Sequence, residues 1–445
     1  MVLDSTTLHS SIEDPVLDRL SFLNEITFRY PDAVSFAPGQ PYDGFFEVED
    51  VHACLRRYAK YLEDSGAGPA QVRAAFHRYA PAAGQIRELI AHSLRQEEGF
   101  EVAPESIVVT VGAQEAMFLV LRTLFATPED VLLLVTPCYA GIIGAARLLD
   151  VTVAAVPERD GRLVVADLER AVRAQRAAGR RPRAVYVVPD HANPTGSTLD
   201  LATRVELLEL ARRCGLLVLE DSPYRLSGPG PRPAMLKALD GSRCVVQLGT
   251  FSKTVFPGAR VGYVVADQEV RDGRGRIRPL ARDLARVKSM VTVNTSSLGQ
   301  AVVAGALLGV DGRLSVLNAG AAEHYRRAMA ATLAELERWL PPGRRRELGV
   351  GWNRPGGGFF LTLRTGFRTG TAALERSARE FGVLWTPMEF FHPFGGGERD
   401  IRLSISSLTP GQVVEGVERL VRFVEASSGG RAAAGPVPGT ESDAS

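Results

Sequence analysis

Lysine, cysteine and long apolar runs are all scarce in this sequence. Of the 52 basic residues in the 445-residue chain, 48 are arginines and four are lysines: Lys60, Lys237, Lys253 and Lys288. The four cysteines are widely spaced, which argues against a disulfide framework or a zinc site and predicts reduced thiols in a cytoplasmic protein without bound metal. No segment reaches the ~18 apolar residues of a membrane span, and residues 1–18 carry acids without an apolar core, so we expect neither a transmembrane helix nor a signal peptide.

The charge balance excludes further classes of protein. The net charge is +1, with 23% charged and 45% hydrophobic residues, which is ordinary for a soluble globular chain. Such a balance gives no electrostatic reason to bind nucleic acid or a membrane surface. We therefore expect neither as a partner.

Short apolar segments alternate with amphipathic ones over residues 106–265. The apolar segments are predicted strands, at 106–111, 131–135, 151–156, 184–188, 216–219 and 245–248. The amphipathic segments are predicted helices, at 113–125, 141–149, 168–178 and 201–214. This alternation is typical of a mostly parallel sheet flanked by helices on both faces, an α/β fold. Residues 259–265 are expected to form an antiparallel or edge strand.

We expect four parts along the chain. These are an N-terminal segment (1–45), a large domain (46–315), a smaller α+β domain (316–425) that includes part of the N-terminal segment, and a disordered Ala/Gly/Ser/Pro-rich tail (426–445). Within the large domain, the basic segment 271–288 has two interpretations. It is either a solvated loop leading into a helix or a docking site for an anionic substrate or partner.

One of the rare lysines, Lys253, lies in the run Gly-Thr-Phe-Ser-Lys-Thr-Val-Phe-Pro-Gly-Ala-Arg, directly after a predicted strand. A desolvated lysine can lose its proton and attack a carbonyl, which arginine cannot do. Hydroxyl groups, backbone N–H groups and Arg260 nearby would suit a phosphate. A carbonyl on a phosphate-bearing ring describes pyridoxal phosphate. The alternative is a surface lysine in a polar loop.

Other segments supply what such a ring needs at the carboxyl ends of strands, where open α/β sheets bind ligands. Asp221 follows a buried strand and can pair with the pyridine nitrogen, or it can simply open the turn before Pro223. Asn193, in an Asn-Pro-Thr-Gly turn, and Tyr224 can donate to the phenolic oxygen. Tyr139, after another strand, can stack on the ring or be a core tyrosine.

Two further elements would hold anions. Gly112 joins a predicted strand to a helix whose free N–H groups suit a phosphate, with Thr250, Ser252 and Arg260 closing the other side. Arg402 alternates with Ile401 and Leu403, so it points away from the packed face of its strand. Its planar fork suits a substrate carboxylate, unless it is an edge-strand surface arginine.

Together these elements resemble the fold-type-I pyridoxal phosphate enzymes, specifically the class I/II aminotransferase family and its 2-aminoadipate/kynurenine-type branch. The resemblance covers residues 36–423 and extends to Pro355-Gly356-Gly357-Gly358-Phe359-Phe360. It implies that Lys253 is the Schiff-base lysine and that Asp221 and Tyr224 assist it. It also implies that the cofactor contacts Gly112, Ala113, Gln114, Tyr139, Asn193, Thr250, Ser252 and Arg260.

The resemblance also implies a substrate site and an oligomeric state. Gly39, Asn193 and Arg402 would bind the amino-acid or 2-oxo acid substrate. Tyr79 resembles the tyrosine that reaches the phosphate of the neighbouring subunit, so a homodimer is expected.

Four features depart from the family pattern. Ala113 replaces the usual serine, and Met388 stands where glycine is usual. His191 precedes the Asn-Pro turn, where a second-layer hydrogen-bonding role is favoured over acid–base chemistry. Residues 61–75 form a longer segment than usual, leading into the region that should cover the active site.

Three functional hypotheses follow. The favoured one is transamination between an amino acid and a 2-oxo acid through Lys253. The second keeps the site but changes the reaction to elimination, decarboxylation or oxidative deamination of a specialised metabolite, motivated by Met388, His191 and segment 61–75. The third, a transcription regulator with an aminotransferase-like sensor, needs a winged-helix region before the fold, for which about 35 residues are too few. The amino donor and acceptor are not identified by the sequence.

Overall fold

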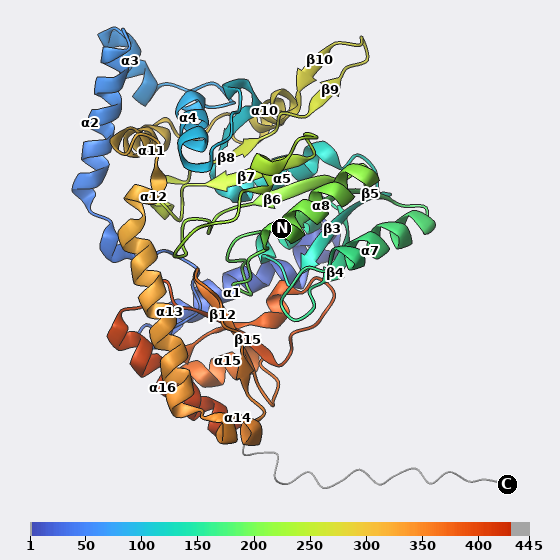
Figure 1. Cartoon of the computed structure of the whole chain (residues 1–445), viewed down its shortest axis with the longest axis vertical. Coiled ribbons are helices and arrows are strands. Elements are labelled where there is room, and N and C mark those ends of the chain that lie inside the picture. The colour runs from blue at the N-terminus through green and yellow to red at the C-terminus, as the bar shows by residue number, and fades with distance from the viewer. Residues whose placement is uncertain (1, 429–445) are drawn as a thin grey trace, which may run out of the picture.

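The fold is built around a seven-stranded sheet, seen in a computed structural model that describes residues 2–428 (Figure 1). The strand order is β2-β8-β7-β6-β5-β3-β4, and only β8 runs antiparallel to its neighbours. Its strands are β2 (Ile107–Thr110), β3 (Asp130–Thr136), β4 (Thr152–Pro157), β5 (Arg181–Val187), β6 (Leu217–Asp221), β7 (Val245–Thr250) and β8 (Gly262–Val265). The expected mostly parallel α/β sheet is confirmed.

Alternate residues of each strand enter opposite cores, as the period of two requires. On one face Leu132 and Leu134 of β3 pack among helices α5 (Gly112–Leu124), α6 (Ala140–Leu148) and α10 (Leu280–Val291). On the other face Val131 and Leu133 pack against α7 (Val165–Ala177) and α8 (Leu201–Cys214). The same face of the sheet extends to β2 and β8. There it is covered by α2 (Val48–Asp64), α4 (Arg87–Glu98) and α11 (Ser297–Gly309).

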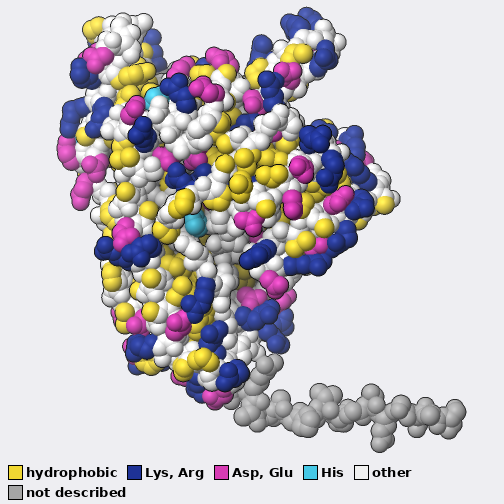
Figure 2. All heavy atoms as spheres, viewed as in Figure 1, with side chains coloured by type: hydrophobic (Ala, Val, Ile, Leu, Met, Phe, Trp, Pro, Cys, Tyr) yellow, Lys and Arg dark blue, Asp and Glu magenta, His cyan; other side chains and the backbone are white. Residues whose placement is uncertain are grey.

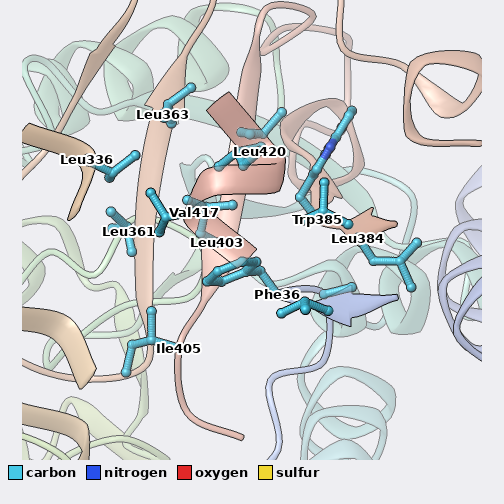
Figure 3. Packing of buried hydrophobic residues seen from close by; sticks show 14 of the residues in the cluster. Phe36, Leu336, Leu361, Leu363, Leu384, Trp385, Leu403, Ile405, Val417 and Leu420 are labelled. Carbon is cyan, nitrogen blue, oxygen red and sulfur yellow. The ribbon is translucent and has the colours of Figure 1, made fainter. Parts of the chain in front are cut away.

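A second, antiparallel sheet has the order β11-β12-β15-β14 and lies at the other end of the molecule. Its strands are β11 (Gly351–Trp352), β12 (Phe360–Arg364), β14 (Thr386–Pro387) and β15 (Asp400–Ser404). Trp385, Leu361 and Leu403 form its core with α13 (Ala319–Trp339) and α16 (Pro410–Ser428) (Figure 3). The remaining helices here are α12 (Leu314–Leu317), α14 (Pro342–Leu348) and α15 (Thr371–Arg376).

The N-terminal segment packs onto this smaller unit. Helix α1 (Pro15–Arg29) contributes Ile26 to its core, and Phe36 is fully buried there. Strand β1 (Val34–Ser35) pairs in parallel with β13 (Val383–Leu384). The first 40 residues therefore reach the site from the side of the smaller unit.

Several local predictions need correction. The strand predicted over 259–265 is antiparallel as expected, but it begins at Gly262 and lies between β2 and β7 rather than at an edge. Helices α1, α3 (Pro69–His77), α11 and α14 were not predicted, because their apolar positions fit no clear single stripe. The predicted tail begins too early, since α16 extends to Ser428, and residues 429–445 lie outside the described part of the chain.

The basic segment 271–288 is not simply a loop. It contains most of the hairpin of β9 (Glu269–Arg271) and β10 (Ile277–Pro279), which projects from the large unit (Figures 1 and 2), and most of α10. Arg276 pairs with Asp272, and Arg278 pairs with Asp283. These local pairs involve both acidic residues of the segment and leave most of its basic residues without a partner inside it, so both interpretations stay predictions.

No helix within residues 2–428 is long and apolar enough to cross a membrane. Helix α9 (Leu236–Leu239) is the remaining α-helix of residues 2–428.

Candidate functional site

The carboxyl ends of β3, β5, β6 and β7 open into one cavity of about 670 Å3. The segments after these strands carry the residues that sequence analysis singled out. Twelve of the fourteen predicted site residues line the cavity: Gly39, Ala113, Gln114, Tyr139, Asn193, Asp221, Tyr224, Thr250, Ser252, Lys253, Arg260 and Arg402. Of the other two, Gly112 lies beside Arg260, which lines the cavity, and Tyr79 lies apart.

Lys253 lies three residues beyond the end of β7 and donates from Nζ to the Gly39 carbonyl oxygen at 2.8 Å. Burial lowers the pKa of its amine to about 8, with help from the positive charges of Arg260 and Arg402 and against the attraction of Asp221. A lysine with such a pKa is partly neutral near physiological pH. It is therefore available as a nucleophile and a base.

Asp221, the last residue of β6, is held by one oxygen only. Its Oδ2 accepts a 2.6 Å hydrogen bond from the Tyr186 hydroxyl group, while its buried Oδ1 has no hydrogen-bond partner among the described residues. Burial raises the pKa of the carboxyl group to about 7, against the opposing effects of Tyr186 and Lys253. A buried acceptor without a donor is costly, so this atom suits a positively charged N–H group of a ligand.

The cavity has two walls, one formed by the sheet with Lys253 and Asp221 and an opposite one formed by the smaller unit. Arg402 on β15 is the positively charged residue of the opposite wall. It is 4% exposed, and its guanidinium group lies 4.6 Å from the Phe360 ring centre and 5.0 Å from that of Phe391. No carboxylate in residues 2–428 lies within 4.0 Å of it, and its buried Nε has no partner there. Burial lowers the pKa of the guanidinium group to about 10. An unpaired buried cation of this kind favours an anionic ligand.

Asn193 and Tyr224 connect these two walls. The amide oxygen of Asn193 accepts from Arg402 Nη1 at 2.9 Å, which leaves its amide nitrogen as a donor. Arg402 also donates from Nη2 to Thr386 Oγ1 at 2.9 Å and to the Ala37 carbonyl oxygen. Burial raises the pKa of the Tyr224 hydroxyl group, and a hydrogen bond with Asn193 opposes the rise. The phenol therefore stays protonated and able to donate.

The far end of the cavity is suited to a phosphate. Gly112 begins α5 with a φ of +70°, and a Cβ atom there would lie 2.7 Å from Arg260 Nη2. Arg260 donates from Nη1 to Ser252 Oγ at 3.3 Å, and Thr250 Oγ1 lies 3.1 Å from the same oxygen. In the part of the chain that is described, no carboxylate pairs with Arg260. A helix N-terminus, two hydroxyl groups and an unpaired arginine together form an anion site.

Tyr139 stands between the two ends of the cavity. Its hydroxyl group donates to Gln114 Oε1 at 3.4 Å, and Gln114 Nε2 in turn donates to the Gly141 carbonyl oxygen at 3.0 Å. Burial raises the pKa of Tyr139. The ring is thereby held at the cavity wall, where Tyr139 lines the cavity and also packs against the core of the large unit.

The predicted residue Tyr79 does not join the others within one chain. It is 86% exposed, on the connection between α3 and α4. Its expected position in a neighbouring subunit stays a prediction.

Of the four departures from the family pattern, Ala113 lines the cavity, and the other three lie outside its lining. His191 has a φ of +49°, packs against Gly228 and Gly358, and hydrogen-bonds through its backbone N–H to Thr198 Oγ1 at 3.1 Å. Met388 is buried beside Phe390. Segment 61–75 forms the end of α2 and most of α3.

Four further aromatic residues at the cavity are not predicted by any motif: Tyr186, Phe390, Phe391 and Phe28. Tyr186 brings the only side-chain hydroxyl group into the buried strand β5, and that isolated polar group was the available signal. Phe390, Phe391 and Phe28 line the substrate end of the cavity but come from segments without a recognisable motif.

The donor set fits pyridoxal phosphate. Asp221 Oδ1 supplies the missing acceptor for a protonated ring nitrogen, Lys253 supplies the amine, and the turn at Gly112 has the space that a Cβ atom would fill. Residues 2–428 contain no cluster of three His, Cys, Asp or Glu side chains that could hold a metal ion.

The known proteins that are similar to this chain in sequence or in structure are aminotransferases. A family profile described as aminotransferase class I and II matches residues 45–420. An (S)-3,5-dihydroxyphenylglycine transaminase of Amycolatopsis orientalis is 45% identical over 425 residues, 95% of each chain. A 2-aminoadipate transaminase of Thermus thermophilus is 30% identical over 402 residues, 89% of this chain and 91% of the relative.

Among solved structures, the α-aminoadipate aminotransferase of Thermus thermophilus, complexed with N-(5'-phosphopyridoxyl)-L-leucine, superposes with a TM-score of 0.77 at 29% identity, covering 96% and 99% of the two chains. The Pyrococcus horikoshii kynurenine aminotransferase, in complex with PMP, gives 0.79 at 26% identity, covering 95% and 98%.

Proposed function

The chain belongs to the class I and II aminotransferases, which use pyridoxal phosphate, and on this premise we propose that its amino-acid substrate is an (S)-arylglycine. It is a transaminase acting on an amino acid and a 2-oxo acid. The relative from Amycolatopsis, with 45% identity along nearly the whole chain, supports a hydroxylated phenylglycine and its arylglyoxylate as one substrate pair. The second pair is a common amino acid and its 2-oxo acid.

One structural observation carries this proposal: the unpaired cation of Arg402 lies beside an aromatic wall. Phe390 and Phe391 are buried and line the cavity together with Phe28. In an arylglycine the ring is attached directly to the α-carbon, so carboxylate and ring lie close together. Arg402 would bind the carboxylate, and the phenylalanine rings would contact the aryl ring in edge or offset geometry. Gly39 and Asn193 would complete the substrate site.

The cofactor roles follow from the geometry of the same cavity. When bound, pyridoxal phosphate supplies an electron-poor ring that accepts the electron pair left by the departing α-proton. Asp221 Oδ1 would keep the proton on the ring nitrogen, and Lys253 Nζ would move the α-proton. Asn193 and Tyr224 would donate to the phenolic oxygen, while Tyr139 would stack on the ring.

The phosphate would be held by two segments that meet at Arg260. The first is the α5 N-terminus, through the backbone N–H groups of Gly112, Ala113 and Gln114. The second supplies Thr250, Ser252 and Arg260. Tyr79 would reach the phosphate of a second copy of the chain, which supports a homodimer, and four free cysteines support a reducing cytoplasmic location.

The alternative reactions receive no support from the cavity. His191, Met388 and segment 61–75 motivated elimination, decarboxylation or oxidative deamination, and none of the three lines it. We therefore propose no second function.

A substrate panel tests the proposal. The holoenzyme is given (S)-3,5-dihydroxyphenylglycine, phenylglycine, phenylalanine and 2-aminoadipate, each with a 2-oxo acid acceptor, and products are identified by mass. We expect the two arylglycines to have the highest kcat/KM. A preference for 2-aminoadipate would contradict the arylglycine assignment. Without an acceptor, transamination releases at most one equivalent of 2-oxo acid per site, so continued release beyond that amount would contradict transamination.

A further inference from the structure

A buried ion pair lies directly behind the turn that begins α5. The Lys288 side chain on α10 is 0% exposed, and its Nζ donates to Glu115 Oε2 at 2.7 Å and to Thr292 Oγ1 at 2.8 Å. Glu115, in the first turn of α5, is buried as well. Neither residue lines the cavity, and the roles proposed above use neither of them.

Glu115 holds the backbone that enters the turn. Its Oε2 accepts from the Val111 backbone N–H at 2.6 Å, and its Oε1 accepts from Thr292 Oγ1 at 2.6 Å. Val111 immediately precedes Gly112, whose left-handed conformation turns the chain into the helix. The carboxylate therefore fixes the peptide that orients the free N–H groups of α5. A carboxylate at a helix N-terminus is also favoured by the helix dipole.

The same carboxylate has an electrostatic disadvantage. A negative charge in the first turn of α5 repels a phosphate dianion at the N-terminus of that helix, and burial weakens the screening. Lys288 supplies the compensating positive charge at 2.7 Å. Removing Lys288 would therefore leave an unneutralised anion behind the turn, whereas removing both charges would not.

We propose that Lys288 and Glu115 are positioning residues for the cofactor phosphate: Glu115 holds the Val111 N–H, and Lys288 neutralises the carboxylate that does so. The inference rests on the proposed assignment of the phosphate to the Gly112 turn. It also gives a function to the last residue of the basic segment 271–288.

The test compares two ligands that differ only in the phosphate. Cofactor-free protein is titrated with pyridoxal 5'-phosphate and with pyridoxal, and the ratio of the two Kd values measures what the phosphate contributes. In Lys288→Met we expect this preference for the phosphorylated ligand to fall by about tenfold. Glu115 then loses its charge-assisted hydrogen bond from Lys288, and its negative charge, no longer neutralised, repels the phosphate. The affinity for pyridoxal should not change.

Lys237→Met is the matched control. The Lys237 side chain is 5% exposed and pairs with Asp267 at 2.6 Å, but it does not line the cavity. We expect a comparable loss of thermal stability with the wild-type ratio. A Lys288→Met protein that keeps the wild-type ratio, or that loses affinity for both ligands equally, overturns the proposal.

Two uncharged double variants keep the test decisive if Lys288→Met does not fold. Glu115→Gln with Lys288→Met keeps an oxygen for the Val111 N–H, and Glu115→Ala with Lys288→Met does not. We expect the first to retain most of the preference and the second to lose it. Equal ratios in the two would overturn the positioning role. A wild-type protein without any preference for the phosphorylated ligand would instead refute the phosphate assignment itself.

Discussion

The two walls of the cavity hold their charged groups in different ways. On the sheet side, Lys253 and Asp221 follow adjacent strands, and each is placed by one short hydrogen bond, to Gly39 and from Tyr186. On the side of the smaller unit, Arg402 is placed by Asn193, Thr386 and Ala37, which come from distant parts of the chain. The first wall is carried by adjacent strands of one sheet and takes only Gly39 from the N-terminal segment, whereas the second exists only after the smaller unit has packed.

The difference indicates that the two walls of the cavity have different functions. The sheet wall presents a partly neutral amine that can move a proton, beside a buried carboxylate whose free oxygen can accept from a ring N–H group. The opposite wall presents a cation that has no carboxylate partner in residues 2–428 and that stays charged, with a pKa of about 10. We therefore expect the sheet wall to govern chemistry and the other wall to govern substrate binding.

Breaking the sheet wall should have the largest effect. Lys253→Ala removes the amine that both captures the cofactor and moves the α-proton, so we expect kcat to fall by at least about 10⁴-fold. Borohydride reduction followed by peptide mass analysis should find no cofactor attached at position 253. Lys60→Ala is the control, because Lys60 is exposed and pairs only with Asp64. A variant with the wild-type absorbance of bound cofactor would contradict the assignment.

Breaking the opposite wall should affect binding more than chemistry. In Arg402→Met we expect kcat/KM for the amino acid to fall by about a hundredfold, mainly through KM, because losing one member of a buried charge pair costs about 2–5 kcal/mol. Cofactor affinity should stay near that of the wild type. Arg364→Met on the neighbouring strand β12 is the control, since Arg364 is exposed and pairs with Asp400. A loss in kcat alone, at unchanged KM, would contradict this division.

The two walls also differ in how far the sequence predicted them. The family, the α/β fold, the cofactor and transamination are confirmed. Lys253, Asp221 and Asn193 were predictable as site residues because each follows an apolar strand, and parallel strands place their carboxyl ends together. Tyr186 was missed because an apolar pattern does not report hydrogen bonds between neighbouring strands.

The wall of the smaller unit was predicted less completely. The alternation around Arg402 predicted which face of β15 it occupies, and Ile401 and Leu403 are indeed fully buried on the other face. It did not predict that Phe390 and Phe28 would line the same cavity, since packing between segments more than 300 residues apart leaves no local periodicity. Helix α1 was not predicted because its apolar positions fit no clear single stripe, and it packs on both α6 and the smaller unit.

The final prediction concerns the coupling between the walls. Burial is the main cause of the low pKa of Lys253, and the positive charge of Arg402 lowers it further. The neutral amine attacks the cofactor, so uptake of pyridoxal phosphate by the cofactor-free protein should accelerate as the pH rises through about 8. In Arg402→Met one source of that lowering is gone, so the pKa of Lys253 and the midpoint of the uptake profile should both move upward.

Stopped-flow absorbance between pH 6 and pH 10 would measure this midpoint, with Arg364→Met keeping the wild-type profile. An unchanged or lower midpoint in Arg402→Met would mean that the two walls act independently, because the electrostatic effect of a buried guanidinium group on a neighbouring amine can only disfavour its protonated form.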